Sequence, residues 1–325
     1  MKKRTRVGLA IVCAIPILSP LLFMAGNNYL IQAATRIFIY GILVLSVEMC
    51  WGQTGIFTFG QAAFFGVGGY FAGFLATHEN ITDLGVILVV AVVVGIIAGT
   101  LVALFLFSGK RVGELYVALV TLVISFVCEK LANSWTFVGS GNGIPGIPYP
   151  TIFGKTLSSS IGLFLVAFGI FALAMMVCIV IIQSQFGLAI NAVRDDEERA
   201  EFFGYNRSAL QIAIFIFSAV LASVGGALFA LSEGFISPSS LGLALSTSTV
   251  LWVVLGGKGT FFGPLLALAL LESVNVEMRS ILPSLWQILV GVMLLLTMIF
   301  LPKGLTSLGE KSRNIRKNRE QSKKS

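Results

Sequence analysis

Charge is scarce in this sequence. Only 11% of its 325 residues are Asp, Glu, Lys or Arg, 56% are hydrophobic, and the mean hydropathy is +0.93. Soluble globular domains carry about 25% charged residues, so the composition argues against that class. The apolar runs are also continuous, whereas the strands of a membrane β-barrel alternate polar and apolar residues. The sequence therefore predicts an all-α membrane protein.

Chemically reactive side chains are equally rare. The chain has a single histidine, His78, and four cysteines without CxxC spacing, so neither a disulfide nor a metal site is expected. HExxH and GxSxG do not occur, and Gly154-Lys155-Thr156 lacks the earlier glycine that a phosphate loop requires. We therefore predict no catalytic centre, no metal and no cofactor, and any ATP hydrolysis is expected in separate subunits.

Long apolar runs recur along the chain. A helix needs about 20 apolar residues to cross the bilayer. The first run follows a basic stretch, as in a signal peptide, but it has no small-residue cleavage site and is interpreted as a retained helix. Glycine, proline and charged residues separate about ten predicted transmembrane or partly embedded helices, at 7–25, 29–51, 57–77, 84–107, 113–134, 159–183, 209–233, 243–257, 262–281 and 284–301.

Most of the 22 Lys and Arg residues fall on one side of such a chain. With a cytoplasmic N-terminus, that side collects residues 2–6, 110–111, 184–208, Lys258 and the tail after 302. The positive-inside rule then predicts that both termini are cytoplasmic. Residues 1–308 form the predicted transmembrane domain. The basic tail at 309–325 is predicted to be disordered and suits anionic lipid headgroups, without any nucleic-acid partner.

One charged segment, from Ser184 to Arg207, interrupts the apolar sequence. It contains three arginines and a cluster of acids: Asp195, Asp196, Glu197, Glu198 and Glu201. Charges of this kind are too costly to place in hydrocarbon, so the segment is predicted to be an aqueous loop. Gly187 and Gly204 bracket a predicted short helix within it. A loop that is merely solvated is the alternative.

Two glycine-rich blocks interrupt the helices. In the first, Gly52 to Gln61, the glycines either permit close helix packing or mark an unwound segment that lines a path. In the second, Leu245 to Gly263, a run of hydroxyls either bonds back to its own helix or faces the same path. The candidate path residues are Gly52, Gly55, Thr58, Gln61, Ser246, Thr247 and Thr249.

Several motifs resemble the LivM-type permease subunits of ABC importers for branched-chain amino acids and their urea-importer relatives. The resemblance covers roughly residues 30–305, in the family's order. The segments that carry it include Gly60–Tyr70, Tyr116–Leu122, Gly139–Ile144, Gly187–Glu197, Gly256–Thr260 and Leu301–Gly304.

The resemblance implies a location in a bacterial or archaeal plasma membrane, a set of partners and a role for the charged loop. The family's permeases pair with a second, related permease, two cytoplasmic ATPase subunits and an extracytoplasmic solute-binding protein. The loop at 184–208 would be the coupling loop, whose short helix docks on the ATPase. The residues that would serve this coupling are Gly187, Arg194, Asp195, Asp196, Glu197, Arg199 and Gly204.

Different residues of the sequence favour different transported solutes. Amino-acid-type members commonly carry Asn where Glu48 stands, so this residue resembles the urea type, whereas Gly143–Pro148 resembles the amino-acid type. We expect branched-chain, hydrophobic amino acids, with urea or short-chain amides as the alternative. An ion-coupled secondary transporter that works alone is the alternative of another class.

Glu48 itself has two interpretations. It lies solvated at the inner end of its helix, or paired with a cation such as Lys258 in the neighbouring glycine turn. Alternatively it lines the path and meets a substrate amine. The first interpretation is preferred, because an importer supplied by an external binding protein needs little binding strength of its own.

Overall fold

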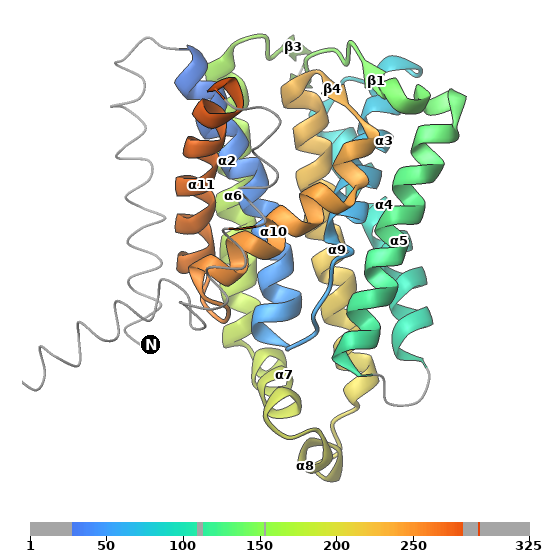
Figure 1. Ribbon diagram of the computed structural model, residues 1–325, viewed down its shortest axis with the longest axis vertical. Coiled ribbons are helices and arrows are strands. Elements are labelled where there is room, and N and C mark those ends of the chain that lie inside the picture. The colour runs from blue at the N-terminus through green and yellow to red at the C-terminus, as the bar shows by residue number, and fades with distance from the viewer. Residues whose placement is uncertain (1–27, 109–112, 153, 282–291, 293–325) are drawn as a thin grey trace, which may run out of the picture.

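The structure, a computed structural model, describes residues 28–108, 113–152, 154–281 and 292. These residues form an upright bundle of helices (Figure 1). The helices of the bundle are α2 (Asn28–Val47), which continues into a π-helix, η1 (Glu48–Gln53), then α3 (Gln61–Thr77), α4 (Leu84–Phe107), α5 (Glu114–Ser134), α6 (Ser160–Gln183), α9 (Arg207–Glu233), α10 (Leu243–Gly256) and α11 (Phe262–Ile281).

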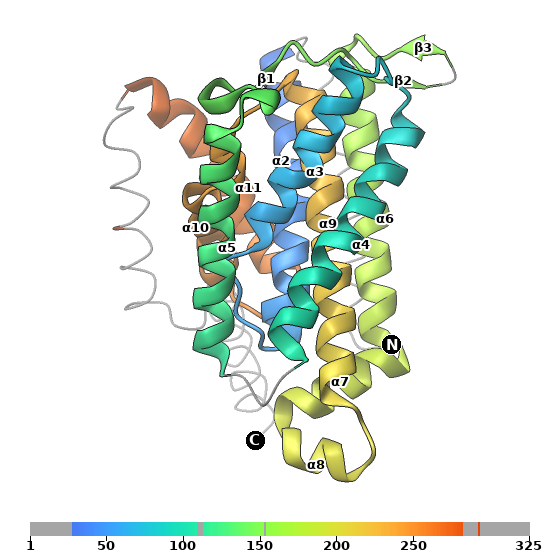
Figure 2. The same ribbon diagram turned by 90° about the vertical axis from the view of Figure 1, so that its right-hand side faces the viewer.

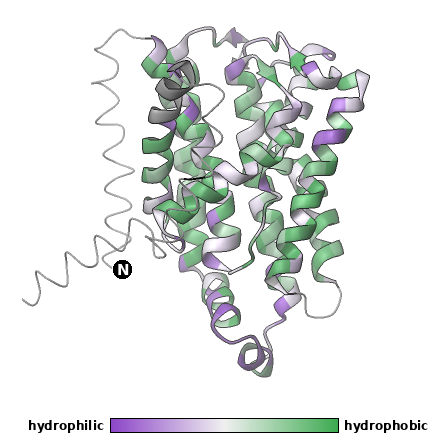
Figure 3. Ribbon diagram, in the orientation of Figure 1, coloured by the Kyte–Doolittle hydropathy of each residue, from purple (hydrophilic) through white to green (hydrophobic). Residues whose placement is uncertain are grey.

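The described helices have the length and composition of an all-α membrane protein. Five of them are long and apolar enough to cross a membrane: 28–53, 84–107, 115–134, 160–183 and 207–233. The shorter helices α10 and α11 are apolar as well. Most residues of the helices are hydrophobic between the two ends of the bundle, and hydrophilic residues are more frequent in α7 and α8 (Figure 3).

The predicted helices agree closely with the observed ones where both are described. The helix at 84–107 has the predicted bounds, and most others differ by one or two residues. The helix predicted at 57–77 begins later, at Gln61, because residues 55–60 form an irregular segment with Gly55 at φ +82°. The predicted helices at 7–25 and 284–301 and the tail at 309–325 lie outside the described residues.

Helix α9 is the centre of the bundle and packs against α2, α3 and α4. Glycines permit the close approach: a Cβ at Gly68 would collide with the backbone of Ser223, and a Cβ at Gly226 would collide with that of Phe65. Serine hydroxyls of α9 then bond across the contacts. Ser223 Oγ donates to Ala91 O at 2.7 Å, and Ser218 Oγ donates to the carbonyl of Ser46 at 2.7 Å. Small residues of this kind hold membrane helices together, where apolar side chains alone gain little from leaving lipid.

Short extended and 3₁₀ segments cover one end of the bundle (Figure 2). Two antiparallel pairs occur there: β1 (Ile144–Pro145) with β4 (Phe235–Ile236), and β2 (Thr151–Ile152) with β3 (Lys155–Thr156). Three 3₁₀ turns accompany them: η2 (Thr136–Val138), η3 (Ser140–Asn142) and η4 (Pro238–Leu241).

A polar element projects from the opposite end. It consists of α7 (Gln185–Asp195) and α8 (Glu197–Phe202), between α6 and α9 (Figure 1). The single helix bracketed by Gly187 and Gly204 was therefore a wrong prediction. Gly187 lies in the first turn of α7, and Asp196 separates the two helices because its side chain caps the second one.

Candidate functional site

Helix α2 ends in an irregular segment that is anchored to α5. The π-helix η1 widens the last turn, after which Gly55 and Ile56 donate back to the carbonyls of Trp51 and Cys50. π-Helical turns of this kind are frequent at functional sites. The chain then crosses to α5, where the amide of Phe59 donates to Thr121 Oγ1 at 3.1 Å and its carbonyl accepts from Ser125 Oγ at 3.0 Å. The segment is thus unwound and packed against α5, and its role in lining a path stays a prediction.

Glu48 is fully buried in the π-helix, at 0% exposure. Its Oε1 accepts hydrogen bonds from the backbone amide of Gly259 at 2.7 Å and from Gln53 Nε2 at 3.3 Å. The expectation of a solvated Glu48 is therefore wrong. The glycine turn does contact this carboxylate, but through a backbone N–H instead of Lys258. Positive φ at Gly257 (+93°) and Gly259 (+86°) gives the turn the conformation that presents this amide.

The position of the Glu48 carboxylate requires a glycine at residue 52. A Cβ at this position would collide with the side chain of Glu48, which lies four residues earlier on the same helix face. Lys258 is exposed in the same turn, with its Nζ 5.5 Å from the ring centroid of Trp51. The two glycine-rich blocks of the sequence therefore meet, with Glu48 between them.

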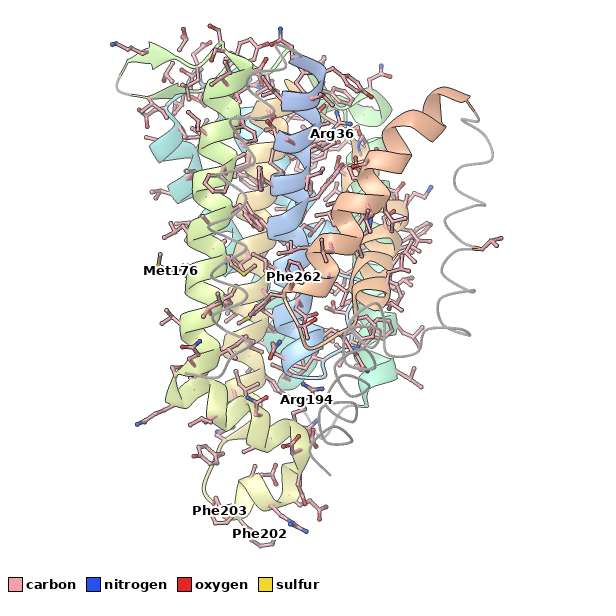
Figure 4. The ribbon with its side chains drawn as sticks, turned by 90° about the vertical axis from the view of Figure 1, so that its left-hand side faces the viewer. Arg36, Met176, Arg194, Phe202, Phe203 and Phe262 are labelled. Carbon is pink, nitrogen blue, oxygen red and sulfur yellow. The ribbon has the colours of Figure 1, made fainter. Side chains whose placement is uncertain are left out.

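Helix α7 also reaches this meeting point. Nη1 of Arg194 donates to the carbonyl of Gly52 at 2.9 Å and lies 3.4 Å from that of Gln53 (Figure 4). These carbonyls end the broken helix and lack the partners that a continuing helix would supply. The guanidinium of Arg194 therefore binds the end of the broken helix, while the residue itself remains exposed.

The start of α7 is fixed by a tight corner. The hydroxyl of Ser184 caps the helix by accepting from the amide of Gly187, and a Cβ at Gly187 would collide with the backbone of Ile182 at the end of α6. Only glycine fits this approach. The corner therefore connects the direction of α7 rigidly to that of α6.

The other predicted coupling residues lie in and around α8. Asp196 caps α8 through the amide of Arg199 and pairs with its Nε at 2.8 Å. Glu197 pairs with Arg207 of α9 at 3.0 Å. Gly204, at φ +85°, ends the turn after α8, and Asp195 is exposed at the end of α7. Apart from Arg194, none of these predicted residues is seen to bond to the irregular segment.

Two aromatic residues at the tip of the α7–α8 element were not among the functional residues predicted from the sequence. Phe202 is 91% exposed and Phe203 is 82% exposed, and both point away from the bundle (Figure 4). The signal available in the sequence was a pair of adjacent phenylalanines inside a charged segment. Large apolar side chains displayed in this way indicate an interaction surface.

The remaining candidates for the path fall into two groups, with and without a hydrogen bond to their side chains. Thr58 accepts from the amide of Gly60, while Thr247 and Thr249 donate to carbonyls of their own helix. Gln61 and Ser246 are different: both are buried, and their side-chain polar atoms have no hydrogen-bond partner among the residues that the structure describes. The back-bonding interpretation therefore holds for Thr247 and Thr249 but not for Ser246.

The chain matches known proteins over most of its length. The family model described as "Branched-chain amino acid transport system / permease component" matches residues 29–298. The LivM permease proteins of high-affinity branched-chain amino acid transport in Salmonella typhimurium and Escherichia coli are each 31% identical over 300 residues, which cover 85% of this chain and 69% of theirs.

A more distant relative extends the match. A probable LivM permease protein of Methanocaldococcus jannaschii is 23% identical over 317 residues, covering 82% of this chain and 90% of its own. No solved structure matches the chain. The family is one of transport permeases of ABC importers, and its members are not known as enzymes. On the family model and the two LivM relatives, the chain belongs to the permease components of branched-chain amino acid ABC transport systems, as a multi-pass membrane protein.

Proposed function

We propose that this chain forms the translocation path for branched-chain, hydrophobic amino acids in an ATP-binding cassette importer. It works with a second, related permease, two cytoplasmic ATPase subunits that hydrolyse ATP, and an extracytoplasmic binding protein. The names of the LivM relatives support the solute. Another relative, the autoinducer 2 import permease LsrC of Escherichia coli, is 28% identical over 51% of this chain. Because its name gives a different solute, the solute of this chain is tested directly.

The proposal includes an orientation. The chain crosses the membrane ten times with both termini in the cytoplasm, residues 1–308 form the membrane domain, and 309–325 form a basic tail. The distribution of Lys and Arg supports this arrangement. The end of the bundle that carries α7 and α8 is then cytoplasmic, and residues 184–208 are the coupling loop.

The observation that carries the mechanism is the hydrogen bond from Arg194 to Gly52. A displacement of α7 by the ATPase reaches the end of the broken helix directly, through the guanidinium and the two carbonyls it contacts. From there it reaches Glu48 and the amide of Gly259 in the turn between α10 and α11. Packed elements move as small rigid shifts, so this series of contacts transmits the movement to both irregular blocks.

The translocation path in this proposal follows those blocks. It uses Gly52, Gly55, Thr58 and Gln61 on one side and Ser246, Thr247 and Thr249 on the other, with Glu48 at its cytoplasmic end. Two of these side chains, Gln61 and Ser246, are buried polar groups without a hydrogen-bond partner in the described part of the chain. Such groups are costly unless another molecule satisfies them during the cycle.

The coupling proposal is tested with Arg194→Gln in the reconstituted importer. We expect normal insertion and normal retention of the ATPase subunits, but at least tenfold less solute transported per ATP hydrolysed. Arg194→Lys keeps a charged donor within reach of one carbonyl and should recover part of the loss. Unchanged transport per ATP in Arg194→Gln would show that α7 acts by another route.

The solute is tested on the cognate binding protein. We expect leucine, isoleucine and valine to bind it and to be taken up, and urea and short amides to do neither. Tight binding of urea with no binding of leucine would replace the proposed solute while leaving the coupling proposal intact.

A further inference from the structure

Three polar side chains on α3, α5 and α10 have no hydrogen-bond or ion-pair partner in the described part of the chain. Gln61 and Ser246 are buried, at 2% and 3% exposure, and no polar atom of either side chain is bonded. Glu129 of α5 is half-buried; its backbone carbonyl accepts from Asn133, but its carboxylate makes no such contact. Ionisable and polar groups left in this state within a membrane bundle indicate a place where a solute binds.

Helix α3 begins in the middle of the bundle. The irregular segment after η1 rises from the lower end of the bundle to about mid-height, where the first turn of α3 starts (Figures 1 and 2). The N-cap residue, Gly60, supplies no side chain to cap the helix. Side chains of a helix lean toward its N-terminus, so the amide of Gln61 lies at this uncapped end. A helix N-terminus with an additional amide donor favours the carboxylate of a ligand.

The carboxylate of Glu129 lies directly against the start of α10. A Cβ at Gly242, the N-cap of α10, would collide with Oε2 and Cδ of Glu129, so only glycine fits beside this carboxylate. The amide of Ser246 donates to the carbonyl of Gly242 at 3.2 Å, which places Ser246 one helical turn further on the same face of α10. The hydroxyl without a partner is therefore about one turn from the carboxylate without a partner.

Helix α5 connects the same carboxylate to the start of α3. Ser125 lies one turn before Glu129 on α5, and its Oγ donates to the carbonyl of Phe59 at 3.0 Å. Phe59 precedes Gln61 by two residues. Four residues of helix rise by about 6 Å, so Glu129 and the N-terminus of α3 are separated by approximately one turn along the contact between α3 and α5.

This separation suits the two charges of an α-amino acid. Its ammonium and carboxylate are attached to one carbon atom, and a hydrogen bond of about 2.8–3.0 Å on each side extends their reach to about one helical turn. Glu129 has the charge to accept from the ammonium, and the start of α3 has the donors for the carboxylate. Lys130, the next residue on α5, is exposed with its Nζ 5.2 Å from the ring centroid of Phe126, so it leaves Glu129 available.

We propose that Glu129, Gln61 and Ser246 bind the ammonium and carboxylate that all α-amino acids share, in the middle of the translocation path. Glu129 pairs with the ammonium, Gln61 and the first amides of α3 bind the carboxylate, and Ser246 bonds to either group. The site rests on the proposed function, to which it adds Glu129 and a substrate class defined by two charges. Leucine, isoleucine and valine are therefore bound alike here, whereas urea, which has neither charge, is not.

The described arrangement is the closed state of this site, because the polar atoms of Gln61 and Ser246 are buried. The segment that precedes Gln61 begins directly after η1, whose Gly52 carbonyl accepts from Arg194. A displacement of α7 is therefore passed along this segment to the start of α3. Movement of Gln61 away from α10 opens the site, and its return encloses the solute.

Binding is measured on the assembled importer in nanodiscs, without its solute-binding protein, by equilibrium binding of radiolabelled compounds. The probes are leucine, leucinol, which lacks the carboxylate, 4-methyl-2-oxopentanoate, which lacks the ammonium, and urea, which lacks both. We expect saturable binding of leucine, at least tenfold weaker binding of leucinol and of the oxo acid, and no binding of urea.

Two variants separate recognition of the charges from a general loss of structure. Glu129→Gln should lower the affinity for leucine at least tenfold and leave that for 4-methyl-2-oxopentanoate unchanged. Gln61→Leu should lower the affinity for leucine at least fivefold and leave that for leucinol unchanged. Glu79→Gln, at a matched glutamate exposed in the loop after α3, should change none of these affinities.

A further variant covers the case in which Glu129→Gln does not assemble. In Gly242→Ala the added methyl group displaces the carboxylate of Glu129 while keeping its charge. We expect at least fivefold weaker binding of leucine in this variant and unchanged binding of the oxo acid.

An equal loss of leucine and oxo acid binding in Glu129→Gln, unchanged leucine binding in that variant, or no saturable leucine binding to the unaltered importer would overturn the site. Uptake with the solute-binding protein added distinguishes this failure from that of the proposed function. Leucine uptake together with any of these binding results rejects the site alone. Uptake of urea in place of leucine rejects the proposed solute, and the site with it.

Discussion

The carboxylate of Glu48 accepts a 2.7 Å hydrogen bond from the backbone amide of Gly259, 211 residues further along the chain. This bond joins the π-helical end of α2 to the turn between α10 and α11. Gly52 leaves space for the carboxylate, and Arg194 binds the carbonyl of Gly52. The end of α2, helix α7 and the turn between α10 and α11 are distant in sequence and are therefore in contact at this point.

Substitution of Glu48 distinguishes its two roles. Glu48→Gln keeps an oxygen acceptor for Gly259 and should retain both thermal stability and uptake. Glu48→Ala leaves the buried amide unsatisfied, which costs about 1–3 kcal/mol, and should lower the melting temperature of the purified protein. If Glu48→Gln melts normally but loses uptake, the carboxylate meets the substrate amine instead.

Gly187→Ala should impair coupling without preventing insertion. The added methyl group collides with the backbone of Ile182, so α7 must move away from its present direction. We expect normal protein levels in the membrane and at least tenfold slower uptake. Gly169→Ala, at a helical glycine with open space around it, is the control and should behave like the unaltered protein.

The exposed pair Phe202 and Phe203 should anchor the ATPase. Burying a phenylalanine side chain contributes about 1.5–3 kcal/mol, and adjacent aromatic anchors dominate many interfaces. The double variant Phe202→Ser, Phe203→Ser should reduce co-purification of the ATPase subunits at least tenfold. Phe137→Ser, at a phenylalanine of η2 that is 56% exposed at the opposite end of the bundle, should not reduce it.

The ion pair between Arg36 and Glu233 should stabilise the contact between α2 and α9. It is bidentate, with distances of 3.0 Å and 2.8 Å between nitrogen and oxygen. A double-mutant cycle on the unfolding transition should give a coupling of about 1–3 kcal/mol. The exchanged pair, Arg36→Glu with Glu233→Arg, should recover most of the stability lost in either single variant, and a coupling near zero would contradict this role.

The helices could be predicted from the sequence because hydrophobic length alone marks them. The run at 84–107 is uniformly apolar and ends at polar residues, so its bounds follow from local composition. The start of α3 could not be placed in the same way. Residues 55–60 are apolar enough for a helix, but Thr121 and Ser125 of α5 bind the backbone of Phe59 and hold it outside a helix.

The candidate site could be predicted in part. Motifs identified the charged loop and both glycine-rich blocks, whose residues then proved to be neighbours. The directions of Arg194 and Glu48 could not be predicted, because each depends on a backbone group far away in sequence. A charged side chain near a helix end is usually solvated, and only the fold shows that a carbonyl or an amide lies within its reach.

The central position of α9 also sets an order for biogenesis. The glycine faces of α3 and α4 pack on α9, which the ribosome completes only after α5 to α8. At about 5–20 residues per second, α4 waits on the order of ten seconds for that partner. During this interval the open glycine faces must be covered by lipid, by the insertion machinery or by a neighbouring chain. Nascent chains that stop before residue 207 would keep these faces open, which makes them natural substrates for membrane quality control.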